Sequence, residues 1–311
     1  MHAALRHALS ADPQARPQPT VTDWWPHRPW AGAVGTDPLA MALLGGFAAD
    51  RVAWAFASGY QAALRALCPD LPGDALAAFC VTEDTGNRPR DIRSTLTAQA
   101  GGGWQLDGAK RWTTLGPSGT LLLVAAALPP QAGDERPQLR LLRVPVPTPG
   151  LAITPMPATR FVPEVPHATL RMDSVHLPAE ALLPGDGYAR YVKPFRTLED
   201  LHVTLAVLAY LLREARARAW PEAFREQLAA VMALLATLAG EDVQAPATHV
   251  ALAGALHLAH ASYVQAQPLW AAAGEGDEAA QRWQRDAALF AVAGAARQQR
   301  AATAWQRLAA G

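Results

Sequence analysis

Three histidines on one expected helix are the first candidates for chemistry, because imidazole is a common metal ligand. His257 and His260 are three residues apart, and His249 precedes them by one to two turns, so a helix could carry them on one face. No cysteine or carboxylate joins them at ligand spacing. We therefore expect no metal site.

Glu199, in the run Leu198-Glu199-Asp200, is a candidate general base. A glutamate in an apolar cleft has a raised pKa, which suits proton abstraction. A glutamate at the start of a helix also interacts favourably with the helix dipole and then needs no chemical role. Adjacent helix residues point about 100° apart, so only one of Glu199 and Asp200 should face a cleft. Both interpretations of Glu199 stay open from the residues alone.

Val81, Thr82, Trp112 and Thr114 lie in two short β-prone runs. A threonine hydroxyl can donate a hydrogen bond, and an indole offers a flat apolar wall. Threonine is also simply common in strands, and tryptophan is more often a core residue. The residues alone leave both interpretations open.

The elements that position these residues fall into three regions. Residues 1–78 are rich in alanine and leucine, with helical spacing at Leu39–Ala49 and Val52–Leu67. Residues 193–311 have four long helical candidates with short breaks, which favours an antiparallel bundle. These candidates are Leu198–Ala217, Pro221–Leu238, Ala247–Ala272 and Glu278–Leu308.

Residues 79–192 show short strands separated by glycine and proline, which predicts a barrel or sandwich. Gly101-Gly102-Gly103 predicts a turn, and Asp107-Gly108 predicts a hairpin. The strands are expected at Phe79–Thr82, Ser94–Ala100, Trp104–Leu106, Lys110–Thr114, Leu121–Ala127, Leu139–Val146, Leu151–Met156 and Ala168–Met172.

Composition excludes several classes of partner. Lys+Arg and Asp+Glu number 27 each, so no net field attracts nucleic acid or an anionic membrane. The apolar runs are too short to span a bilayer, and the start lacks a signal-peptide pattern. Cys68 and Cys80 are the only cysteines, which favours a reducing, cytoplasmic compartment. We interpret Arg213–Arg218 as a solvated helix face, or as a contact for an anionic phosphate.

Three motifs in the strand region resemble those of the acyl-CoA dehydrogenase family. The resemblance implies an α+β fold with an N-terminal helical domain (1–78), a central β-barrel (79–192) and a C-terminal four-helix bundle (193–311). It covers nearly the whole chain, and both helical regions look shortened. The motifs are Phe79-Cys80-Val81-Thr82-Glu83, Leu106 to Thr114 with the order Gly-Ala-Lys-Arg-Trp-Thr-Thr, and Ala168 to Glu180.

The resemblance also implies FAD as cofactor and a role for each matched residue. Val81 and Thr82 would face the isoalloxazine ring, with Thr82 bonding its pyrimidine edge. Trp112 would cover the dimethylbenzene side, and Thr114 would donate to the redox nitrogen. Donors of this kind stabilise the negative charge that reduction places on the ring.

The chain departs from the family pattern in several places. Gly86-Asn87-Arg88 replaces a Gly-Ser-Asp turn, and the Arg-x-x-x-Phe-Gly and Gly-Gly-x-Gly-Tyr segments for the adenine half are missing. Arg285-Asp286 resembles the pair that opens the last long helix, yet Gly294 stands where a catalytic glutamate often follows. Some members carry the base on the first helix of the C-terminal bundle, which would make Glu199 the base.

The expected function is the FAD-dependent α,β-dehydrogenation of an acyl thioester such as acyl-CoA, with an electron-transfer flavoprotein as a possible acceptor. Two alternatives stay open: a non-catalytic homologue that acts as an interaction partner or subunit, and a flavin monooxygenase of the same fold. We also expect a homodimer or homotetramer. Val203–Leu212, Leu228–Leu238 and Val250–Leu258 are apolar on more than one face, so they should be buried.

Overall fold

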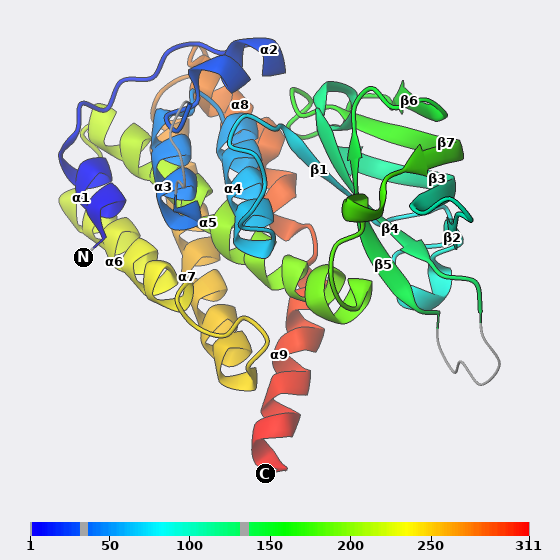
Figure 1. The fold of residues 1–311 in the computed structure, drawn as a ribbon. Helices are drawn as coiled ribbons and strands as arrows, with labels where there is room; N and C mark the ends of the chain where they lie inside the picture. Colours follow the sequence, from blue (N-terminus) through cyan, green and yellow to red (C-terminus); the bar gives the residue numbers. More distant parts are fainter. Residues whose placement is uncertain (1, 32–36, 131–136, 311) are drawn as a thin grey trace. The chain divides into compact units, whose positions relative to one another are not determined.

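The computed structural model describes residues 2–31, 37–130 and 137–310 (Figure 1). The chain divides into two compact units. The helical unit contains residues 1–73, 159–164 and 196–311, and the sheet unit contains residues 74–158 and 165–195. The predicted α+β fold class is confirmed. The finer division at residues 78/79 and 192/193 stays a prediction.

The sheet unit is built on one mixed sheet, drawn in cyan to green in Figure 1. The strands pair in the order β1-β4-β2-β3-β7-β6. β5 lies outside this order and pairs with β4. β1 is parallel to β4, whereas β3 is antiparallel to both β2 and β7. The strands are β1 (Ala77–Cys80), β2 (Thr95–Ala98), β3 (Trp104–Thr114), β4 (Leu121–Ala127), β5 (Leu139–Pro145), β6 (Leu151–Pro155) and β7 (His167–Leu177).

The strand predicted at Leu121–Ala127 is β4, which lies in the core of the sheet unit. Its sequence, Leu-Leu-Leu-Val-Ala-Ala-Ala, is a continuous apolar run and is buried along almost its whole length. Such a run suits a central strand that is covered on both faces. Leu96, Leu106, Leu142 and Leu170 from four neighbouring strands pack into the same core.

The hairpin expected at Asp107-Gly108 is wrong. β3 continues through these residues from Trp104 to Thr114, and the turn before it lies at Gly101–Gly103 as predicted. Gly108 has φ +134° at a register shift between β3 and β7, so it marks a β-bulge. The Asp107 carboxylate fixes this bulge by accepting a hydrogen bond of 2.7 Å from the backbone N–H of Ser174.

The helical unit combines segments from both ends of the chain. The helices expected around Leu39–Ala49 and Val52–Leu67 are present as α3 and α4, and two short helices before them were not predicted. The helices are α1 (Ala3–Ser10), α2 (Val21–Trp24), α3 (Pro38–Ala48), α4 (Val52–Leu67), α5 (Lys193–Ala217), α6 (Glu222–Leu238), α7 (Pro246–Ala271), α8 (Glu278–Asp286) and α9 (Gly294–Ala309). Among the described residues, none of the helices is both long and apolar enough to cross a membrane.

The single helix expected from Glu278 to Leu308 is wrong. It is divided into α8, a 3₁₀ turn (Ala287–Ala291) and α9. Val292 leaves the helical region with ψ +139°, and Ala293 has φ +65°, a left-handed conformation that interrupts the helix. Arg285-Asp286 therefore ends α8 instead of opening the last long helix.

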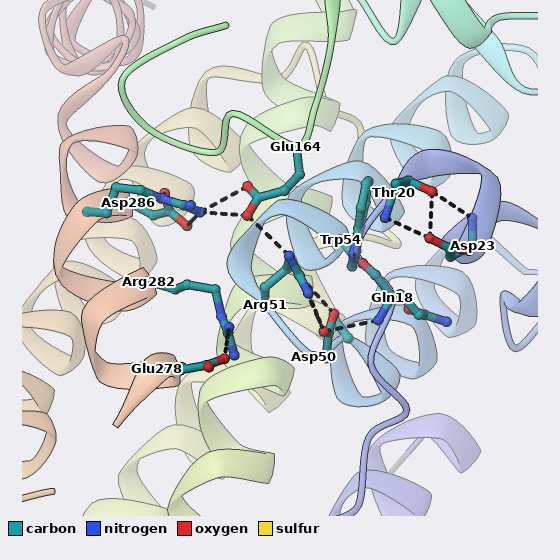
Figure 2. Close-up of polar contacts among 12 residues, drawn as sticks. Gln18, Thr20, Asp23, Asp50, Arg51, Trp54, Glu164, Glu278, Arg282 and Asp286 are labelled. Atoms are coloured by element: carbon teal, nitrogen blue, oxygen red, sulfur yellow. Dashed lines mark hydrogen bonds and ion pairs between the residues drawn. The ribbon is translucent and has the colours of Figure 1, made fainter. Parts of the chain in front are cut away.

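The end of α8 binds the segment 159–164 within the helical unit. Asp286 is fully buried and accepts a hydrogen bond of 2.7 Å from the backbone N–H of Val162. Glu164 pairs with Arg285 at 2.9 Å and with Arg51 at 3.3 Å. Figure 2 shows Arg51 and Glu164 directed toward one another, with Asp286 beside Glu164. These charges bind the segment 159–164 to α4 and α8.

Only some of the apolar faces that suggested an oligomer are exposed to solvent. Leu205 to Leu212 on α5 are buried within this one chain, so their apolarity requires no partner. Leu234 on α6 and Leu258 on α7 are 38% and 50% exposed. The expected burial of α5 is therefore met within one chain, while α6 and α7 do present apolar residues to solvent.

Candidate functional site

The two motifs expected to hold a flavin lie beside each other in the sheet unit. The chain leaves β1 at Cys80 and runs as Val81-Thr82-Glu83 along the end of β3. The backbone N–H of Arg111 donates a hydrogen bond of 2.8 Å to the Thr82 carbonyl. This contact joins residues 29 positions apart and places the end of β1 next to the Trp112 segment.

A buried ion pair beneath this contact was not predicted. The Lys110 ammonium donates to Glu83 Oε1 at 2.7 Å and to the Val81 carbonyl at 3.4 Å. Glu83 also accepts hydrogen bonds from the backbone N–H of Arg93 and from both the N–H and the hydroxyl of Ser94. Both residues stand inside the recognised motifs, but their pairing depends on the sheet register rather than on local sequence.

The Glu83–Lys110 pair keeps its charges despite the apolar surroundings. Burial on its own would raise the pKa of Glu83, but the nearby Lys110 charge and the donated hydrogen bonds hold that pKa below its usual value. Burial lowers the pKa of Lys110, and Glu83 opposes this change. The pair therefore fixes the ends of β1 and β3 against one another.

Trp112 adopts an unusual conformation at a second bulge in β3. Its φ is +57°, and the β3–β7 register shifts between Lys110 and Thr113. A left-handed backbone is costly for a bulky residue, and such outliers cluster at functional sites. The bulge turns the indole outward, so that 48% of Trp112 is exposed. Arg111 and His167 flank the ring, at 5.6 Å and 6.0 Å from its centroid.

Thr82 and Thr114 are half-buried, and Val81 is buried. Among the described residues, neither threonine hydroxyl has a hydrogen-bond partner. Two available hydroxyl donors and an exposed aromatic ring in adjoining segments suit a planar heterocycle with polar edges. The residues present therefore fit the isoalloxazine half of FAD.

His167 is a residue that sequence reasoning missed at this position. It is the β7 partner of Thr114 in the sheet register, and its ring meets Trp112 edge to face. Burial lowers the pKa of His167, and a hydrogen bond with the backbone of Val165 only partly opposes this. The imidazole is therefore neutral near pH 7. A strand-end histidine carries no local signal that would have identified it.

Glu199 lies on α5, in the helical unit. The expectation that it starts a helix is wrong, because α5 begins at Lys193 and follows a π-helical turn at Tyr188–Val192. Glu199 is thus more than one turn inside the helix, where the dipole no longer stabilises a carboxylate. Burial, followed by the Asp200 charge, raises the pKa of Glu199 to about 7.

Asp200, the neighbour of Glu199, has a different environment. Its Oδ1 accepts from Arg297 Nε at 2.7 Å, and its Oδ2 accepts from Arg300 Nη2 at 2.6 Å. Asp200 is 7% exposed, whereas Glu199 is only partly buried and forms no ion pair within the described chain. The two consecutive carboxylates therefore differ: one is fixed by arginines, and the other can exchange a proton.

The interpretation of Arg213–Arg218 as a solvated face is wrong at both ends of that run. Arg213 is 6% exposed, donates to the Ala49 carbonyl and pairs with Glu214 at 2.8 Å. Arg218 pairs with Glu214 at 2.9 Å and with Asp277 at 2.7 Å. These side chains link α5 to its neighbours in the helical unit, so they are not available as a phosphate contact.

The three histidines do not gather as metal ligands. His249 Nε2 contacts the Val243 carbonyl at 2.8 Å, and His257 and His260 are exposed on α7. Within residues 2–31, 37–130 and 137–310, no three side chains of the His, Cys, Asp or Glu type are grouped to hold a metal ion.

Residues 78–175 match the family model "Acyl-CoA dehydrogenase, middle domain". This match covers β1 to β7 almost completely, including both expected flavin motifs. None of the curated proteins matches the chain by sequence.

Several solved structures share the fold at low sequence identity. Butyryl-CoA dehydrogenase from Megasphaera elsdenii is 18% identical, with a TM-score of 0.65 over 86% of this chain and 81% of that one. Acyl-CoA dehydrogenase from Geobacillus kaustophilus is 18% identical, with a TM-score of 0.64 over 97% and 96%. The FAD complex of PigA is 14% identical, with a TM-score of 0.64 over 96% and 88%.

Residues 78–175 are thus similar to the acyl-CoA dehydrogenase middle domain, and the chain shares the acyl-CoA dehydrogenase-like fold.

Proposed function

We propose that the chain binds FAD through Val81, Thr82, Trp112 and Thr114 and dehydrogenates an acyl thioester, with Glu199 as the base. The observation that carries the proposal is the exposed Trp112 face beside two half-buried threonine hydroxyls that have no protein partner in the described chain. PigA, a structural relative, is known in complex with FAD, which supports the choice of cofactor.

The residues divide the chemistry between them. Bound FAD would accept the β-hydrogen of the thioester as a hydride. Thr82 and Thr114 would donate hydrogen bonds to the ring, and Trp112 would exclude water from one side of it. Glu199 Oε would take the α-proton, which requires the carboxylate to be ionised when substrate binds.

The thioester class, the electron acceptor and the compartment complete the proposal. Butyryl-CoA dehydrogenase among the relatives supports a CoA thioester, and an electron-transfer flavoprotein is the acceptor we propose. A cytoplasmic location agrees with the two cysteines, which are buried and form no disulfide in the described chain.

Flavin bleaching under anaerobic conditions tests this function. Purified protein is loaded with FAD and mixed with short, branched and long acyl-CoAs, and the visible absorbance is followed. Wild type should bleach with at least one substrate, and Glu199→Gln should be about 10²–10⁴-fold slower. Glu222→Gln on α6 is the matched control, since Glu222 is an exposed helix-start glutamate.

The alternatives predict different results in the same assay. A protein that binds FAD without bleaching under any substrate favours a flavin monooxygenase, which oxygen consumption would then reveal. A protein that binds no FAD favours the non-catalytic homologue. Equal bleaching rates in wild type and Glu199→Gln would remove Glu199 from the mechanism.

A further inference from the structure

Asp200 is held by the C-terminal helix from two sides. Arg297 and Arg300 are three residues apart on α9, so both side chains lie on one face of that helix. Each binds a different oxygen of the Asp200 carboxylate, at 2.7 and 2.6 Å. Arg297 also donates to the Phe290 carbonyl, which fixes it further. Charge-assisted bonds of this kind, at a residue only 7% exposed, define one geometry.

The same arrangement acts on Glu199, the next residue on α5. Side chains at consecutive helix positions diverge by about 100°, so Glu199 points in a different direction from Asp200, which contacts α9. Burial opposes ionisation of Glu199 most strongly, the Asp200 charge opposes it further, and the Arg297 charge favours it. The charges of Asp200 and Arg297 therefore adjust how readily the buried Glu199 loses a proton.

Few other charged groups face Glu199. On α5, Arg196 favours its ionisation, and His202 contacts the Leu198 carbonyl at 2.8 Å with its own pKa lowered by burial. From α7, His249 approaches the Thr197 hydroxyl at 3.5 Å. The Asp200–Arg297–Arg300 group joins α5 and α9 at the residue next to Glu199.

We propose that Asp200, bound by Arg297 and Arg300, is a positioning residue for the base Glu199, and that helix α9 thereby becomes part of the catalytic machinery. This inference rests on the proposed function, and it assigns a role to the carboxylate next to the proposed base.

The proposal predicts opposite effects for its two partners. Arg297→Gln leaves Asp200 less compensated, so the pKa of Glu199 should rise above about 7, by about one pH unit. Asp200→Asn removes the opposing charge and releases Arg297, so the pKa of Glu199 should fall by a similar amount. The double variant should return close to the wild-type value, and Arg297→Lys should preserve it.

The pKa can be read directly by ¹³C NMR of protein labelled at the glutamate side-chain carboxyl carbon. The Glu199 signal is assigned by its loss in Glu199→Gln, and it is titrated in the absence of substrate. The matched control is Arg307→Gln, which removes an exposed charge from the same helix. Circular dichroism confirms that each variant is folded.

Shifts of opposite sign in Arg297→Gln and Asp200→Asn, with no shift in Arg307→Gln, support the proposal. An unchanged Glu199 titration in both variants overturns it, as does an equal shift in Arg307→Gln. The pH profile of flavin bleaching should move with the NMR titration. Absence of bleaching in wild type at every pH refutes the proposed function, while the NMR result still decides the coupling between Asp200 and Glu199.

Discussion

The Lys110 ammonium lies 2.7 Å from Glu83 Oε1, and the two side chains are 0% and 8% exposed. Removing one partner of a buried pair leaves an uncompensated charge, which typically costs about 3–5 kcal/mol. Lys110→Met should therefore lower the free energy of unfolding by this amount in urea denaturation. Arg171→Gln is the control, because its pair with Asp173 is 79% and 71% exposed and should contribute less than about 1 kcal/mol.

The Glu83 carboxylate also makes stability depend on pH. Its pKa is below the usual value in the folded state, so its contribution is present above the unfolded-state pKa and is lost as the pH falls. Wild type should lose stability on acidification below about pH 5 more steeply than Glu83→Gln. Equal slopes for the two proteins would contradict the assignment of Glu83 as an ionised member of the pair.

Gly108 is required by the bulge in β3. A Cβ atom there would lie 2.5 Å from the Ser94 hydroxyl oxygen, and φ is +134°. We expect Gly108→Ala to cost about 2–3 kcal/mol in urea denaturation. Gly101→Ala, where nothing lies within 4 Å, should stay within about 0.5 kcal/mol of wild type. Two equal losses would show that the bulge does not constrain the residue.

Glu199 should produce the opposite pH dependence to Glu83. Its pKa rises from 4.5 to about 7 on folding, so its contribution is complete below pH 4.5 and is lost as the pH rises through 7. Glu199→Gln should therefore gain stability relative to wild type between pH 5 and pH 8, by at most about 3 kcal/mol. Parallel stability curves over this range would mean that Glu199 is not shifted.

Apolar side chains on α7 and α9 support an oligomer. Leu258 and Val264 are 50% and 56% exposed, and Trp305 and Leu308 are 61% and 46% exposed. Such surface is commonly covered by a second chain. We expect at least a dimer by light scattering at micromolar concentration, weakened by Trp305→Asp. The neighbouring Gln306→Asp, which adds the same charge at an exposed polar position, should leave it intact.

Elements bounded by clear breaks could be predicted from sequence. Val52–Leu67 and Leu121–Ala127 agree with α4 and β4, because a helical period or a continuous apolar run ends at each boundary. The hairpin predicted at Asp107-Gly108 was wrong because a type I′ turn and a β-bulge both favour glycine at a positive φ. Only the distant partner Ser174 distinguishes the two.

Less of the candidate site than of the fold could be predicted from the sequence. The motif residues Thr82 and Trp112 could be chosen by resemblance, but Glu83–Lys110 joins residues 27 positions apart. The contacts from Asp200 to Arg297 and Arg300 span 97 and 100 positions. Pairings of this kind are set by how strands and helices pack, and no local pattern encodes them.

The threonine hydroxyls should contribute individually to flavin affinity. A single neutral hydrogen bond contributes about 0.5–1.5 kcal/mol, so Thr82→Val and Thr114→Val should each weaken FAD binding roughly 2- to 12-fold. Thr97→Val, on an exposed position of β2, is the control and should bind as wild type does. Unchanged affinity in both test variants would remove the threonines from the proposed site.

Titration of the purified protein with FAD, followed by tryptophan fluorescence, tests the central claim most directly. Bound isoalloxazine should quench Trp112, with half-saturation at or below tens of micromolar, roughly −6 kcal/mol on the affinity scale. Trp112→Phe should lose that part of the quenching while retaining its circular dichroism spectrum. No quenching of wild type in this concentration range would contradict a flavin site at Val81, Thr82, Trp112 and Thr114.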